Sequence, residues 1–203
     1  TAGALAERCF HMAQRLDEPA RLLQAHWALG LSCFYTGRLP EAREHLHQVI
    51  AAYQPQQHNP LALQDPGITS LTYDALALWL LGFADQAVQR NQQMLALAQQ
   101  LAQPFSRAWA LSFAAMLHYL LRQAPTAQAY AEQGIELCRQ QGFAMYLAMN
   151  TMIRGWALTV QGQPEEGLAA IHRGLARYTA TGASLSVPTY LSLLAESYQH
   201  SNQ

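Results

Sequence analysis

Small and apolar residues recur every three or four positions along most of the chain, in pairs of segments separated by a turn. The first complete pair has Leu29, Gly30 and Cys33 before a turn at Gly37, and Ala42, Leu46, Val49 and Ile50 after it. This spacing gives two successive α-helices one apolar face each. Gly30 and Ala42 are small enough for the helices to approach closely, and Pro40 suits the first turn of the second helix. The pattern therefore predicts an antiparallel helical hairpin.

The hairpin pattern returns at intervals of about forty residues. Its turn positions are Gly37, Gly82, Arg122, Gly162 and Asn202, in steps of 45, 40, 40 and 40 residues. Stacked helix pairs are the architecture that repeats in this way. Half units around Ala6, Phe10 and Ala13 at one end and Leu191, Ala195 and Tyr198 at the other complete the array. We therefore expect an all-α fold of roughly ten helices and no strands, forming one solenoid domain over residues 1–203.

Two segments carry a family resemblance. Leu29-Gly30 followed by Gly37 and Ala42, and the parallel run Gly82-Phe83-Ala84-Asp85-Gln86-Ala87, resemble tetratricopeptide repeats (TPRs). The resemblance implies a right-handed superhelix of antiparallel helix pairs, with the first helix of each pair lining a concave surface where ligands bind. The units here are about forty residues long rather than about 34, so we expect helices longer by roughly one turn.

A second resemblance is narrower. Gln64-Asp65-Pro66-Gly67 together with Leu78-Trp79-Leu80-Leu81-Gly82 is similar to the repeat-containing C-terminal regions of large bacterial signalling ATPases, some of which are fused to nucleotide-cyclase or transcription-regulator domains. This likeness implies a sensor or partner-docking role. The chain opens at Thr1 without Met, and its last helix has no partner after Ser201, so we also expect a segment of a longer protein.

The five extra residues of the first step fall between Tyr53 and Gly67. Pro55, Pro60, Pro66 and Gly67 interrupt a glutamine-rich stretch there, which predicts a loop. A solvated connector is the simpler interpretation of residues 54–67. The alternative is a lid that folds over the groove, because long loops in compact arrays are often functional.

The charge composition excludes several classes of function. Charged residues make up 12% of the chain, its net charge is −1, and all its basic residues are Arg. Without Lys, this segment has neither a Schiff-base residue nor a phosphate-loop lysine. A sequence pI near 6.7 gives no basic footprint for nucleic acid. No metal-ligand spacing, nucleophile elbow or glycine-rich phosphate cradle occurs, so we predict no enzyme activity, no metal and no cofactor.

Cysteine usage and hydropathy bear on location. Cys9, Cys33 and Cys138 are odd in number and lie in apolar helical surroundings, which predicts reduced, buried thiols. The sequence has no charged-then-apolar leader and no run of eighteen apolar residues. We therefore expect a cytoplasmic protein with no membrane partner.

The tryptophans follow the repeat. In the predicted register, all four fall on the inner face of the first helices, with other aromatic residues and methionines beside them. The candidate groove residues are Trp27, Phe34, Trp79, Trp109, Met116, Tyr119, Met149, Met152 and Trp156. Exposed Trp beside adaptable Met suits a peptide, a protein segment or an apolar small molecule. The alternative is that these side chains pack against one another and fill the groove.

Charged residues supply candidate polar contacts. Asp74 and Arg154 stand where the repeat calls for an apolar residue, and Arg107 precedes the Trp109 segment. They would give polar specificity inside an apolar groove, unless they simply reach solvent. His45 and His47 point to different helix faces, and His118 is expected to be a hydrogen-bonded core residue.

These features favour a non-catalytic sensor or interaction module that regulates a fused effector domain. The alternative is an architectural scaffold with a filled groove, which forms homo-oligomers through its helix ends.

Overall fold

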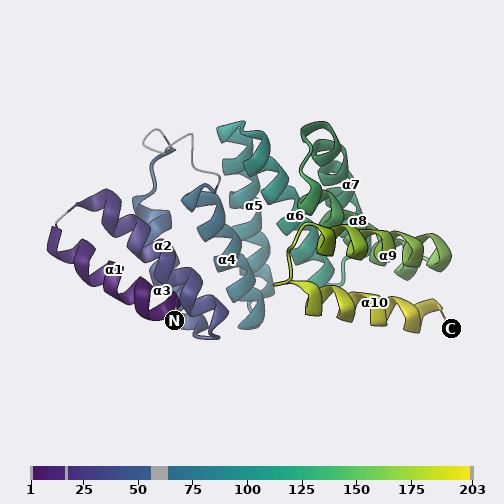
Figure 1. Ribbon diagram of the computed structural model, residues 1–203, viewed down its shortest axis with the longest axis horizontal. Coiled ribbons are helices and arrows are strands. Elements are labelled where there is room, and N and C mark those ends of the chain that lie inside the picture. Colours follow the sequence, from purple (N-terminus) through teal and green to yellow (C-terminus); the bar gives the residue numbers. More distant parts are fainter. Residues whose placement is uncertain (1, 17, 56–63, 202–203) are drawn as a thin grey trace. The chain divides into compact units, whose positions relative to one another are not determined.

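The protein consists of α-helices throughout the part of the chain described by the computed structural model, residues 2–16, 18–55 and 64–201 (Figure 1). The ten helices are α1 (Ala2–Leu16), α2 (Pro19–Tyr35), α3 (Leu39–Ala52), α4 (Pro66–Leu80), α5 (Ala84–Leu101), α6 (Pro104–Leu120), α7 (Ala124–Gln141), α8 (Ala144–Val160), α9 (Pro164–Ala180) and α10 (Val187–Ser201). This confirms the predicted fold class.

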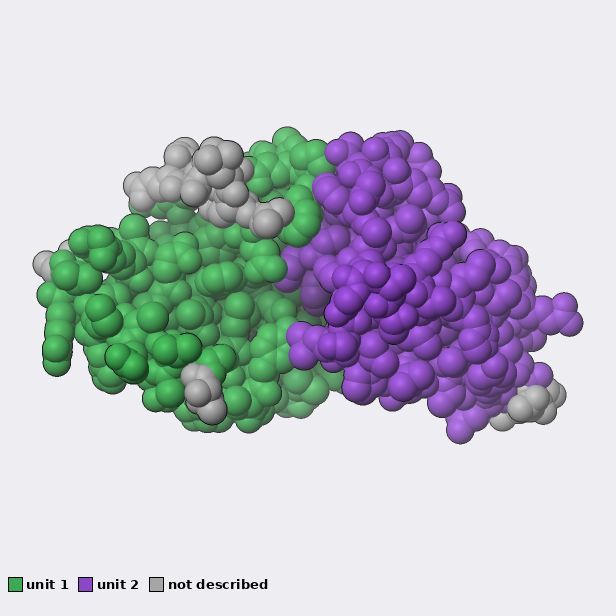
Figure 2. All heavy atoms as spheres, viewed as in Figure 1, with its two compact units in different colours: residues 1–106 green, residues 107–203 purple. Residues whose placement is uncertain are grey.

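The chain divides into two compact units, residues 1–106 and 107–203 (Figure 2). In unit 1, each helix from α1 to α5 packs on its neighbour in sequence, and α2 also contacts α4. In unit 2, α7, α8, α9 and α10 pack in the same way, and α8 also contacts α10. Each unit therefore has the packing scheme of a helix-pair repeat, while a single solenoid domain over residues 1–203 stays a prediction.

The turns inside the pairs are nearly identical. Gly37, Gly82, Arg122 and Gly162 all have positive φ angles, of 79°, 89°, 62° and 85°. After each one, the next backbone N–H donates to a carbonyl five residues earlier over 2.9 Å, which closes the helix end in a Schellman motif. Arg122 holds this left-handed conformation although its Cβ disfavours it. Four of the five predicted turn positions are thus confirmed, and Asn202 lies outside the described residues.

The predicted loop is shorter than expected at its C-terminal end. Pro66 and Gly67 belong to the first turn of α4, because Asp65 caps that helix by accepting a hydrogen bond from the Ile68 N–H at 2.8 Å. Proline suits a first helical turn, so reading Pro66 as an interruption was wrong. Tyr53 covers this helix start and donates from its hydroxyl to Asp65 Oδ2 at 2.5 Å. Residues 56–63, to which the lid prediction refers, lie outside the described residues.

Small residues set the close helix crossings. A Cβ atom added to Gly30 would lie 2.7 Å from Leu46 Cδ2 of α3, as expected for the α2–α3 hairpin. The closest crossing joins α8 and α9, where a Cβ on Gly167 would lie 2.5 Å from the Gly155 carbonyl oxygen. The predicted role of small residues in bringing paired helices together is confirmed at these positions.

Candidate functional site

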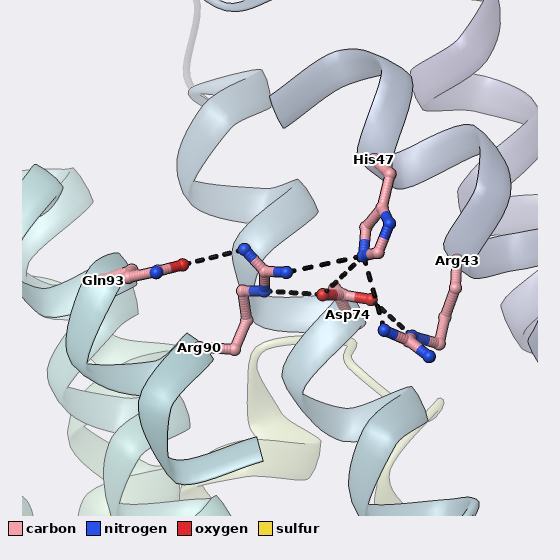
Figure 3. Close-up of polar contacts among 5 residues, drawn as sticks. All are labelled: Arg43, His47, Asp74, Arg90 and Gln93. Atoms are coloured by element: carbon pink, nitrogen blue, oxygen red, sulfur yellow. Dashed lines mark hydrogen bonds and ion pairs between the residues drawn. The ribbon is translucent and has the colours of Figure 1, made fainter. Parts of the chain in front are cut away.

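A buried carboxylate joins three helices of unit 1 (Figure 3). Asp74 of α4 has no exposed side-chain surface, and its Oδ1 accepts a hydrogen bond from Arg43 Nε of α3 at 2.9 Å. Its Oδ2 lies 2.6 Å from Arg90 Nε of α5 and 3.2 Å from His47 Nε2. Arg90 Nε makes no hydrogen bond, so its contact with Asp74 Oδ2 is an ion pair only. Two guanidinium groups therefore compensate the one charge that α4 buries.

The other two candidate charges have different surroundings. Arg154 of α8 is half-buried and contacts Glu132 Oε1 of α7 at 3.3 Å and Glu166 Oε1 of α9 at 3.1 Å. Arg107 is exposed on α6. Asp74 thus takes its partners from α3 and α5, and Arg154 from α7 and α9. The need for partners was predicted correctly, but contact of these three residues with a ligand stays a prediction.

Apolar side chains of α2 and α4 keep exposed surface in unit 1. Trp27 is half-buried and donates from Nε1 to Thr69 Oγ1 at 2.7 Å, which ties α2 to α4. Phe34 lies edge-on to Tyr73 with ring centroids 5.0 Å apart. We group under the name aromatic surface the half-buried Trp27, Phe34 and Trp79 with the exposed Tyr35, Leu80 and Phe83; these residues lie on α2, on α4 and, for Phe83, at the start of α5. Tyr35, Leu80 and Phe83 each keep about half of their residue surface exposed.

The candidate aromatic and methionine residues of unit 2 are buried. Each has 7% or less of its surface exposed: Trp109, Met116, Tyr119, Met149, Met152 and Trp156. Trp156 packs edge-on against Tyr119 at 4.9 Å and donates from Nε1 to Glu196 Oε1 at 2.9 Å. Burial, and secondarily the charge of Glu196, raises the pKa of Tyr119. Side chains buried to this degree meet a ligand only after the surrounding helices rearrange.

Two histidines form a pair in unit 1. The Nδ1 atoms of His26 on α2 and His45 on α3 lie 2.9 Å apart, so one ring donates and the other accepts. Phe10 of α1 packs edge-on against both rings. Burial lowers the pKa of each histidine, and the charge of His45 lowers that of His26 further. Burial therefore disfavours protonation of both histidines, and the charge of one ring would oppose a charge on the other.

We expect unit 1 to lose stability as the pH falls from about 7 to about 5. The unfolded histidines take up protons near their ordinary pKa, while the folded pair resists protonation. The stability is therefore present above the unfolded pKa and is lost below it. Thermal midpoints measured across this range should fall less steeply for a His26→Leu/His45→Leu variant. Equal slopes for the two proteins would contradict this assignment.

His118 and two of the three cysteines are buried, as predicted, and the third cysteine is exposed. His118 is buried, and its Nδ1 lies 2.6 Å from Gln123 Oε1, as expected for a core histidine. Cys33 and Cys138 are buried, whereas Cys9 is exposed on α1, so the prediction of three buried thiols was wrong for Cys9. Burial raises the pKa of Cys138 to about 11, which keeps this thiol protonated at neutral pH. In residues 2–16, 18–55 and 64–201, no three metal-ligating side chains cluster.

The sequence prediction missed Arg43, His47 and Arg90. Its three candidate charges, Asp74, Arg107 and Arg154, all lie on first helices of the predicted pairs, and it considered His47 only for its helix face. The usable signal was the i, i+4 spacing of Arg43 and His47, which places both side chains on one face of α3 beside the charged position in α4.

Comparison with known proteins defines the class of fold. No protein-family model and no curated protein matches the chain. Among solved structures, the nearly identical TPR-like repeats assigned to a kinesin light chain of Podosopora anserina match over 92% of this chain and 90% of theirs, with 21% identity and a TM-score of 0.63. The chain therefore has a TPR-like fold.

Two further solved structures share this fold. BtubC (BKLC) of P. vanneervenii has 16% identity and a TM-score of 0.71, over 98% of this chain and 83% of its own. PlcR of Bacillus thuringiensis, solved with the peptide PapR7 and DNA, has 12% identity and a TM-score of 0.71, over 100% of this chain and 69% of its own. At these identities the likeness concerns the fold. No helix in the described part of this chain is long and apolar enough to cross a membrane.

Proposed function

We propose that this chain is a non-catalytic interaction module that binds a peptide or protein segment on the aromatic surface of α2 and α4. The observation that carries the proposal is the exposure of apolar residues on α2, on α4 and at the start of α5: Tyr35 is 52% exposed, Leu80 52% and Phe83 49%, and Trp27, Phe34 and Trp79 are half-buried. Aromatic anchors of this kind commonly dominate binding energy. The TPR-like fold of PlcR, which was solved with a peptide, supports the same class of ligand.

The proposed partner is an apolar segment, such as one face of an amphipathic helix. In this proposal, the buried candidates in unit 2, from Trp109 to Trp156, keep α6 and α8 packed and do not meet the ligand. Occupation of the aromatic surface would favour one of two conformations and so regulate a fused effector domain. The free, buried thiols of Cys33 and Cys138 support a cytoplasmic location.

A peptide selection tests the proposal. A phage-displayed library of random peptides, selected on the immobilised chain, should yield sequences with apolar residues at helical spacing. A Phe34→Ala/Trp79→Ala variant should bind the selected peptide at least about tenfold more weakly, because it loses two ring anchors. Trp27 is left unchanged because its hydrogen bond to Thr69 joins two helices.

Leu185→Ala provides the matched control. Leu185 is 69% exposed in unit 2 and lies outside the aromatic surface. Its replacement should leave peptide affinity unchanged. Selection of no apolar sequence, or an equal loss of affinity in the control variant, would show that the aromatic surface is not the binding site.

The architectural alternative has its own supporting observation. A pocket of about 860 Å³ between α1 and α2 is lined by Leu5, Leu31 and Tyr35, and α1 also exposes Met12 and Leu16. We propose as its occupant α10 of a second copy, which exposes Leu191 and Tyr198. Light scattering should then show a mass that rises with concentration and returns to that of one chain in a Leu5→Glu/Met12→Glu variant. A single-chain mass at all concentrations would remove this alternative.

A further inference from the structure

A polar pocket of about 450 Å³ lies among α7, α8 and α9 of unit 2. Its charged lining consists of Glu132, Glu136 and Arg139 from α7, Arg154 from α8, and Arg173 and Arg177 from α9. The whole chain has 12 basic residues and a net charge of −1, so one third of its positive side chains line this one pocket. Arginine side chains are therefore concentrated at this pocket, which favours an anionic ligand there.

The carboxylates of the pocket already have partners. Glu132 Oε1 accepts from Gln128 Nε2 at 2.9 Å and contacts Arg154 Nε at 3.3 Å. Glu136 Oε1 accepts from Gln140 Nε2 at 2.7 Å. Arg154 is in turn balanced by Glu132 and by Glu166. The acidic groups are thus engaged within the three helices.

Three arginines remain without compensation. Arg139, Arg173 and Arg177 form no hydrogen bond or ion pair with any residue in the described part of the chain. Arg173 and Arg177 are also four residues apart on α9, an arrangement that destabilises a helix because like charges face each other. Arg139 and Arg177 lie in the last turns of α7 and α9, where the helix dipole favours positive charge, but none of the three arginines has a carboxylate partner among the described residues.

The repeat shows that helix packing does not require them. Asp74 and Arg154 stand 80 residues apart, each eight residues before a turn glycine, so they occupy the same position in two repeats. Two repeats before Arg173 and Arg177, the chain has Gln93 and Leu97. In unit 1, Arg43 and Arg90 form ion pairs with the charged residue at this position, Asp74. In unit 2, Arg139, Arg173 and Arg177 have no carboxylate partner among the described residues.

We propose that this pocket binds the phosphoryl group of a small phosphorylated molecule. The forked donors of Arg139, Arg173 and Arg177 match phosphate oxygens, and a doubly negative phosphate balances the excess charge of the lining. The volume suits a small ligand rather than a bare ion. The printed partners of Glu132 and Glu136 use only Oε1, so the Oε2 atoms of these residues, at the α7 side of the pocket, accept hydrogen bonds from hydroxyl groups on the remainder of the ligand.

Calorimetric titration at constant ionic strength tests the proposal, with glucose 6-phosphate, inorganic phosphate and glucose as probes. We expect both phosphates to bind, the sugar phosphate more tightly, and glucose not to bind. An Arg173→Gln/Arg177→Gln variant should bind both phosphates at least about tenfold more weakly, because each lost guanidinium removes charge-assisted hydrogen bonds. Both arginines are exposed, so the variant should keep its circular dichroism spectrum and thermal midpoint.

Arg8→Gln/Arg15→Gln provides the control, since it removes the same charge from exposed positions on α1 of unit 1. Its affinity for both phosphates should equal that of the unaltered chain. The proposal is overturned if neither phosphate binds at millimolar concentration, or if the two double variants lose affinity equally. Peptide binding on the aromatic surface is a separate property, and neither result bears on it.

Discussion

Replacing Asp74 with asparagine should lower the free energy of unfolding by about 3–5 kcal/mol. The substitution keeps the shape of the side chain but removes the charge that compensates Arg43 and Arg90, whose side chains are only 23% and 21% exposed. Two partly buried guanidinium groups would then face each other around a neutral amide. Denaturant unfolding measured by circular dichroism gives the change directly.

An apolar variant separates the charge from the packing. In Asp74→Leu/Arg43→Met/Arg90→Met, all three charges are replaced by apolar side chains, so no buried charge is left without compensation; His47, whose side chain is 43% exposed, can turn to water. This triple variant should be within about 1 kcal/mol of the original chain or more stable than it. A loss below about 1 kcal/mol for Asp74→Asn alone would show that water already screens the cluster.

Replacing Gly167 with alanine should destabilise unit 2 by at least about 2 kcal/mol. Its Cβ would lie 2.2 Å from Thr159 Oγ1, 2.5 Å from the Gly155 carbonyl oxygen and 2.9 Å from the Thr159 nitrogen. Two of these are backbone atoms of α8, which cannot rotate away, so the helices must separate. Helix propensity alone would make the alanine variant more stable by about 1 kcal/mol. We expect the opposite change in the free energy of unfolding at this position.

The exposed Ala169, two residues further along α9, provides the comparison. Ala169→Gly should cost about 1 kcal/mol through helix propensity alone. Alanine would then be the better residue at position 169 and the worse one at position 167, as thermal unfolding of the two variants can show. A stabilised Gly167→Ala variant would contradict the close α8–α9 crossing.

Most of the fold could be predicted because its determinants are local. Helix periodicity and the spacing of turn residues located Gly37, Gly82 and Gly162, and the repeat even placed Arg122 in a conformation that its own side chain disfavours. The error at Pro66 arose because proline both interrupts helices and begins them, and the capping bond from Ile68 to Asp65 decides between the two.

The site was harder to predict, because periodicity tells which face a residue occupies but not how closely the next helix approaches that face. The register places Trp27 and Trp156 on the same inner face of their first helices, yet Trp27 is half-buried and Trp156 is 1% exposed. Arg43 precedes Asp74 by 31 residues and Arg90 follows it by 16 residues. Whether such distant side chains meet depends on their length and on the distance between the helices, which the sequence pattern does not give. The resemblance to signalling ATPases stays a prediction.

The central claim is that the aromatic surface of unit 1 meets the partner while the indoles of unit 2 serve as core. Nitrogen-15 labelling of the four tryptophans gives one indole N–H signal for each, assigned by single Trp→Phe replacements. On addition of the selected peptide, we predict that the signals of Trp27 and Trp79 shift and those of Trp109 and Trp156 stay in place. Shifts confined to Trp109 and Trp156 would contradict the claim.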